Sequence, residues 1–143
     1  MRFLSIALVA GCETVDATCD DPRGCPGTVV VDLSGDAPTF TMEGTGDVVP
    51  DVLSVVKHVD CSPRDFVWDV KRIPNLDAPI VYGRLPDRAK EELEPVPLEE
   101  GEDYEVMFAK TMLLGGTFGT EAWSATFTWG EPGSVRSEDT GCP

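Results

Sequence analysis

The chain is short of basic residues and of histidine, and each shortage excludes a class of function. Its 143 residues include 11 Lys and Arg against 26 Asp and Glu, a formal net charge of -15 at pH 7. Nucleic-acid binding requires Lys and Arg to displace counterions from phosphates, and electrostatic attachment to an anionic membrane requires them as well. We therefore expect no nucleic-acid partner. The single histidine, His58, excludes any site that needs two imidazoles.

Long apolar runs are also lacking, and none reaches the roughly 18 residues of a membrane-spanning helix. The chain begins with one arginine, a short apolar stretch over residues 3–10 and then small residues, which is the order of a secretory signal. The residues Val9-Ala10-Gly11-Cys12 resemble the lipobox of bacterial lipoproteins. That resemblance implies cleavage before Cys12, lipidation of its sulfur, and anchoring in the bacterial cell envelope, facing the periplasm or the surface. A signal cleaved elsewhere and a cytosolic chain are the alternatives.

The cysteine count agrees with this interpretation. Five cysteines are an odd number for an exported protein, and lipidation of Cys12 leaves an even set of Cys19, Cys25, Cys61 and Cys142. Such a set is typical of two disulfides in an oxidising compartment. We favour Cys19–Cys25 with Cys61–Cys142, and a Cys25–Cys61 pairing is the main competitor. No CxxC spacing occurs, so we do not expect a zinc site.

Apolar residues recur at every second position between residues 28 and 129, which is typical of half-buried strands. Turn residues separate the strands, among them Ser62-Pro63-Arg64 and Gly115-Gly116, and seven or eight short strands predict a two-sheet antiparallel sandwich. Only Pro86–Glu94 invites assignment to a helix, with an extended acidic loop as the equal alternative. The alternating sets are Val29/Val31/Leu33, Phe40/Met42, Phe66/Trp68/Val70, Ile80/Tyr82, Tyr104/Val106/Phe108 and Trp123/Ala125/Phe127/Trp129, with a β-branched run over 52–59 whose inward face is ambiguous.

One short motif is more specific. Leu98, Gly101 and Tyr104 follow the pattern L-x-x-G-x-x-Y, which resembles the tyrosine corner of fibronectin type III and other immunoglobulin-like sandwiches. The resemblance implies an all-β, immunoglobulin-like sandwich in which the Tyr104 hydroxyl bonds to upstream backbone and Tyr104 opens the penultimate strand. We accordingly divide the chain into a signal peptide (1–11), a tether (12–26), the sandwich (27–130) and a C-terminal tail (131–143).

The sequence contains only weak signals for catalysis or metal binding. His58 lies near Asp60, Ser54 and Ser62 in the sequence, but no nucleophile motif accompanies these residues, so we predict no catalytic site and no enzyme. Acidic clusters such as residues 99–103 supply oxygen ligands without any fixed calcium spacing, so no metal or cofactor is expected and calcium stays a minor option.

The best candidate for a contact surface is an apolar loop between the last two strands, formed by Met112, Leu113, Leu114 and Phe118. We therefore expect a membrane-anchored exported lipoprotein that acts as a non-catalytic interaction or structural module. Its partners would be the membrane, through the lipid, and an envelope protein or glycan. A calcium-dependent or carbohydrate-binding module is the alternative.

Overall fold

A computed structural model describes residues 26–46, 48–59, 62–114 and 117–137, without the side chains of residues 62–64, 112–114, 117–119 and 137. No helix in this part of the chain is long and apolar enough to cross a membrane. The elements, in chain order, are β1 (Thr28–Asp32), β2 (Thr39–Glu43), β3 (Val52–Val59), β4 (Ser62–Lys71), β5 (Ile80–Val81), β6 (Lys90–Leu93), β7 (Asp103–Leu114), β8 (Thr117–Thr128), a 3-10 turn η1 (Pro132–Ser134) and β9 (Arg136–Ser137).

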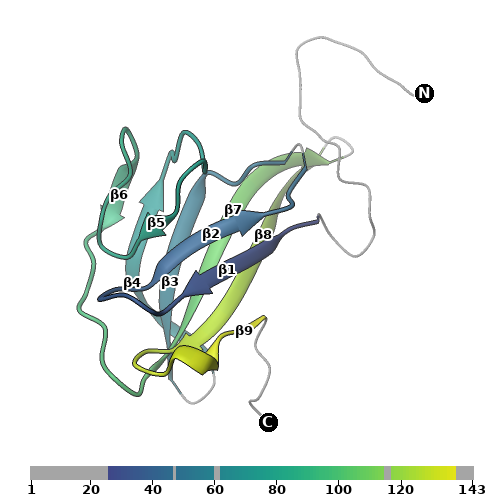
Figure 1. Cartoon of the computed structure of the whole chain (residues 1–143). Coiled ribbons are helices and arrows are strands. Elements are labelled where there is room, and N and C mark those ends of the chain that lie inside the picture. Colours follow the sequence, from purple (N-terminus) through teal and green to yellow (C-terminus); the bar gives the residue numbers. More distant parts are fainter. Residues whose placement is uncertain (1–25, 47, 60–61, 115–116, 138–143) are drawn as a thin grey trace.

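The strands form two antiparallel sheets, one in the order β1-β2-β5 and the other in the order β6-β4-β3-β7-β8-β9. Figure 1 shows the smaller sheet lying across the face of the larger one. Immunoglobulin-like domains also divide their strands between two sheets, with A, B, E and D in one and C, F and G in the other. The order β1-β2-β5 is similar to A-B-E and the order β3-β7-β8 to C-F-G, while β4 and β6 extend the larger sheet beyond β3 and no fourth strand joins the smaller sheet in the described residues. The predicted all-β, two-sheet sandwich is confirmed, with the short β6 and β9 added at the edges.

The core lies between the two sheets and is rich in aromatic side chains. Phe40 of β2 and Phe127 of β8 are fully buried, and their ring centroids are 6.1 Å apart, so this pair joins the sheets. Phe127 also stacks on Tyr104 of β7 at 5.8 Å. Trp68 of β4 is fully buried and meets Tyr82 edge-on at 5.3 Å. Burial of a phenylalanine side chain contributes roughly 1.5–3 kcal/mol, so this cluster is a main source of stability.

A β-bulge in β4 changes the predicted alternation. Val55 is paired with Trp68 and Val56 with Phe66, so Val67 is an extra residue on β4. The prediction that Phe66 faces the core and Val67 faces outward is therefore wrong. Phe66 is 53% exposed and Val67 only 5%. The ambiguous face of β3 is also resolved, because Leu53 and Val55 belong to the core between the sheets, whereas Val56, although only 2% exposed, does not.

Two local assignments also need correction. Residues 90–93 form β6, which pairs with β4, so the segment 86–94 is neither a helix nor an extended loop throughout. Ser62-Pro63-Arg64, expected to be a turn, is the start of β4, where Ser62 pairs with Val59. In both cases cross-strand pairing, which is not visible locally, overrides the turn and helix signals.

The end of the sandwich involves part of the predicted tail. Residues 136–137 form β9 and pair with β8, and the Ser134 hydroxyl donates to the carbonyl of Thr128 at 3.1 Å. Thr126 and Thr128, which alternate with the apolar residues of β8, are consequently buried as well, at 1% and 8% exposed. The Thr128 hydroxyl donates to the Asp103 carboxylate at 2.5 Å, which satisfies it away from water.

Candidate functional site

The predicted tyrosine corner is present at the start of β7. The Tyr104 ring is buried, and its hydroxyl oxygen accepts a hydrogen bond of 2.9 Å from the backbone N–H of Glu99, five residues upstream. Gly101 lies between them with φ +85°, a left-handed conformation that glycine adopts without steric cost. Leu98 is partly buried and packs against the core. The corner therefore fixes how the chain enters β7, which is a structural role.

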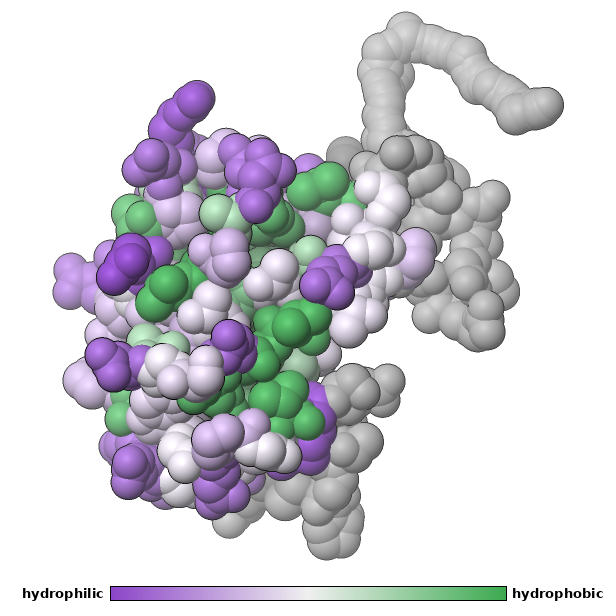
Figure 2. Space-filling model, in the orientation of Figure 1, coloured by the Kyte–Doolittle hydropathy of each residue, from purple (hydrophilic) through white to green (hydrophobic). Residues whose placement is uncertain are grey.

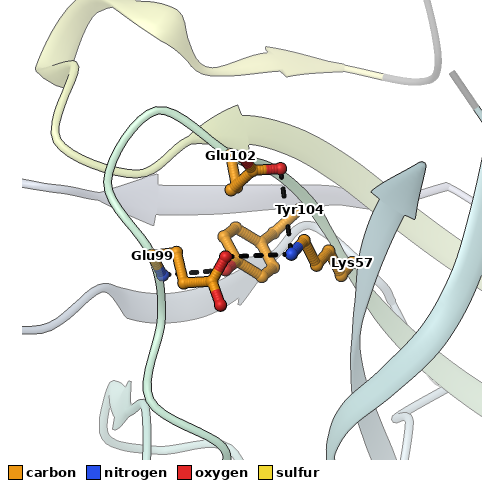
Figure 3. A network of polar contacts seen from close by, with 4 residues as sticks. All are labelled: Lys57, Glu99, Glu102 and Tyr104. Carbon is orange, nitrogen blue, oxygen red and sulfur yellow. Dashed lines mark hydrogen bonds and ion pairs between the residues drawn. The ribbon is translucent and has the colours of Figure 1, made fainter. Parts of the chain in front are cut away.

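A lysine completes the corner (Figure 3). The Lys57 ammonium lies 3.0 Å from a Glu99 carboxylate oxygen and 3.8 Å from one of Glu102. The hydrogen bond to Glu99 raises the pKa of Lys57, and burial raises the pKa of Tyr104. The acidic cluster that suggested calcium thus has its own cation, and Asp103 is bonded to Thr128. In the part of the chain that the structure describes, no three His, Cys, Asp or Glu side chains converge to hold a metal ion.

The residues considered for catalysis lie on β3 but act in separate pairs. The Ser54 hydroxyl donates to Asp69 of β4 at 2.9 Å, and His58 Nε2 lies 3.0 Å from a Glu105 oxygen of β7. His58 is four positions after Ser54 on the same strand, which corresponds to about 13 Å. The two pairs therefore link β3 to its two neighbours and do not form a nucleophile with its base. Asp60 and the Ser62 side chain lie outside the described residues.

The tryptophans do not form an exposed platform of the kind that stacks on sugars. Trp68 is fully buried and its indole N–H donates to Glu91 at 2.7 Å. Trp123 is 6% exposed and its N–H donates to the Pro26 carbonyl at 3.1 Å, while Trp129 is partly buried against the core. These indoles contribute to core packing, and that of Trp123 also holds the backbone at Pro26. Their burial counts against the carbohydrate-binding alternative.

Several predicted site residues cannot be placed. The lipidation site Cys12 and the disulfide candidates Cys19, Cys25, Cys61 and Cys142 all lie outside the described residues. Met112, Leu113 and Leu114 belong to β7 and Phe118 to β8, where Leu113 pairs with Phe118. They therefore form the end of a long hairpin rather than a loop, and their side chains are outside the description.

The structure contains a surface cleft that the sequence analysis did not anticipate. Its volume is about 500 Å³, and it lies between the β4–β5 and β5–β6 connections, beside the short edge strand β5. The lining includes three prolines, Pro74, Pro79 and Pro86, and two arginines, Arg84 and Arg88. Because proline restricts the backbone, three prolines favour a cleft that is already formed before anything binds.

Charge and backbone conformation set this cleft apart from the rest of the surface. Residues 71–90 hold five of the eleven basic residues and only two acidic ones, a local charge of +3 in a chain of -15. Arg88 in the cleft and Arg72, which is outside it, have φ angles of 67° and 58°. Positive φ is uncommon for residues other than glycine and is often retained at functional sites. The clustering of basic residues is visible in the sequence and could have indicated this region, whereas the cleft could not.

The cleft is the candidate functional site that the described residues support best. Its polar groups are two guanidiniums, the Asn75 amide and one carboxylate, Asp87, on a lining that is otherwise largely apolar. Such a lining suits a ligand that carries negative charge beside apolar groups. In comparisons with known proteins, no protein-family model, no curated protein and no solved structure matches this chain.

Proposed function

We propose that the protein is an exported lipoprotein, anchored in the bacterial cell envelope through Cys12, whose sandwich is a non-catalytic interaction module. The single observation that carries the interaction part is the open cleft of about 500 Å³ beside β5, which Arg84 and Arg88 line. The anchoring part depends on the lipobox resemblance at residues 9–12 and on the odd number of cysteines.

The rest of the described surface supports a binding role more than a chemical one. Ser54 and His58 lie about 13 Å apart along β3 and bond to carboxylates on opposite neighbouring strands, so Ser54 is not a nucleophile that His58 could activate. The tyrosine corner and its lysine, in turn, tie β3 and the loop before β7 together. A sandwich stiffened in this way suits a rigid support that presents loops to a partner.

The anchoring part is tested by expressing the full chain in a bacterium and measuring the intact mass of the membrane-extracted protein. We expect a chain that begins at Cys12 and carries a lipid. The matched variant, Cys12→Ser, should keep its leader or be released from the membrane fraction. A wild-type protein that is found in the cytosol with residues 1–11 retained and no lipid would contradict the anchoring part alone.

The interaction part is tested separately by cross-linking in intact cells. We expect the wild-type chain to cross-link to a partner of defined mass, and the paired substitution Arg84→Glu with Arg88→Glu to abolish that product. The Lys110→Glu variant serves as the control, because Lys110 is on β7, outside the cleft, where its ammonium lies 3.6 Å from Asp51. Equal loss in both variants would contradict a role for the cleft.

A further inference from the structure

The positive charge around the cleft is local and acts only at short range. At physiological ionic strength the Debye length is about 8 Å, so the field at Arg84 and Arg88 is set by residues near the cleft and not by the total charge of -15. The cleft lining carries two arginines and one aspartate. An acidic ligand is therefore attracted at this site and repelled over most of the remaining surface, which restricts it to the cleft.

Both arginines are available to a ligand. Arg84 and Arg88 are exposed, and no described carboxylate forms an ion pair with either of them. The neighbouring lysines differ, because Lys71 lies 3.7 Å from Asp69 and Lys90 lies 3.2 Å from Glu92. A guanidinium offers a planar set of donors that matches a carboxylate with two parallel hydrogen bonds.

The position and composition of the cleft favour an extended chain over a compact ion. The cleft follows β5, which is the outermost strand of its sheet, and both residues of β5 line it. Leu85, which is 41% exposed, adds an apolar contact beside the arginines. Edge strands are common docking places for extended peptides, which place alternate side chains in pockets. Figure 2 shows strongly hydrophilic residues over much of this face, including the side that carries β5 and β6, with paler and hydrophobic residues between them.

The position of the cleft favours a protein over a membrane as the partner. In Figure 1, β1 begins on the right of the molecule, whereas β5 and β6 lie on the left. The proposed tether joins the domain at β1, so the cleft lies across the domain from the proposed anchor.

We propose that this cleft binds an extended acidic segment of a partner protein, with Arg84 and Arg88 each holding a carboxylate and Leu85 contacting an apolar residue between them. This inference names the ligand chemistry of the proposed interaction module and rests on that function only for the existence of a partner. Binding of an acidic segment does not itself require the lipid anchor, and only the preference for a protein over a membrane uses it.

The test uses the full chain and a short synthetic peptide with glutamate at every second position and valine or alanine between. Binding is followed by fluorescence anisotropy at physiological salt, and a peptide with lysine in place of glutamate is the ligand control. Arg84→Glu and Arg88→Glu should each weaken binding about tenfold or more, which is the effect expected for loss of one charge-assisted pair. The matched variant is Arg72→Glu, because Arg72 is also exposed and also has a positive φ, but does not line the cleft.

The outcomes are distinct. Loss of binding in the two cleft variants, with less than about twofold change in Arg72→Glu, supports the proposal. Equal weakening by Arg72→Glu, or no binding of the acidic peptide by the wild type, overturns it. The proposal of a protein partner is also overturned if glutarate or inorganic phosphate binds as tightly as the peptide. The same holds if phosphatidylglycerol vesicles bind through the same arginines. Thermal melting of each variant confirms folding, and the milder Arg84→Gln and Arg88→Gln variants replace any that fails. Peptide binding without lipidation of Cys12 would leave this inference standing while the anchoring proposal fails.

Discussion

Substitution of Tyr104 by phenylalanine removes one oxygen atom from the tyrosine corner and leaves the packing around it intact. The ring is 1% exposed and stacked on Phe127, and a phenylalanine ring fills the same space. What is lost is the acceptor for the Glu99 backbone N–H, at 2.9 Å. Tyr104→Phe therefore isolates the hydrogen bond from the burial of the side chain.

The magnitude follows from what happens to the orphaned N–H. A typical internal hydrogen bond contributes about 1 kcal/mol, and an unpartnered buried donor costs about 1–3 kcal/mol. Because the Glu99 side chain is 65% exposed, water reaches this region and reduces the penalty. We expect Tyr104→Phe to lower the free energy of unfolding by about 1–2 kcal/mol. Tyr104→Ala, which also removes the buried ring, should cost about 3–5 kcal/mol.

Urea unfolding followed by tryptophan fluorescence measures both losses, with an unchanged slope against urea as the check that the folded and unfolded states are comparable. The control is Glu99→Ala, which removes the carboxylate paired with Lys57 but keeps the backbone N–H. Its cost should be small, because mostly exposed ion pairs contribute little. A Tyr104→Phe protein as stable as the wild type would refute the reasoning. Equal destabilisation by Glu99→Ala would show that the ion pair, and not the hydroxyl, holds the corner.

Two further predictions concern alkaline pH and glycine positions. Burial raises the pKa of both Tyr82 and Tyr104, so the folded state holds their phenolic protons more tightly than the unfolded state does. The resulting stabilisation is complete below about pH 10 and decreases as the pH rises above it. We therefore expect the urea midpoint to fall above that pH, and to fall less in the Tyr82→Phe variant. Retention of the wild-type midpoint up to pH 11 would contradict this assignment. Gly101→Ala should cost about 1 kcal/mol, because φ is +85° and the space is open, whereas Gly27→Ala should cost more, because its Cβ would lie 2.8 Å from Trp123 Nε1. The same unfolding assay compares the two glycines, and equal costs would indicate that the Trp123 contact is not restrictive.

The strands and the tyrosine corner could be predicted because their signals are local. A period of two in β7, where Tyr104, Val106 and Phe108 are buried, is a direct consequence of side chains alternating across a strand. The corner motif is equally local, since Gly101 and Tyr104 both lie within five residues of Glu99 in the sequence. In both cases the residues that make the interaction are close together in the sequence, so a short sequence pattern is enough to predict it.

The errors came from contacts between distant residues. Phe66 was expected in the core because it continued the alternation of Trp68, but the bulge opposite Val55 turned it outward. Likewise, Lys90–Leu93 became a strand because the edge of β4 was available for pairing. Neither segment contains a signal of its own for these outcomes, because bulges and edge pairing depend on the register of a partner strand.

The amino-acid sequence by itself determined the period-two strands and the net charge, and it supplies the prediction of a lipidation site at Cys12, since composition and local pattern need no fold. Only the tertiary structure decided that Arg84 and Arg88 border one cleft beside β5 and that Lys57 forms an ion pair with Glu99 at the corner. The reason is physical: hydrophobic alternation acts along the chain, whereas a cleft or a charge pair exists only where folding brings separate segments within a few ångströms.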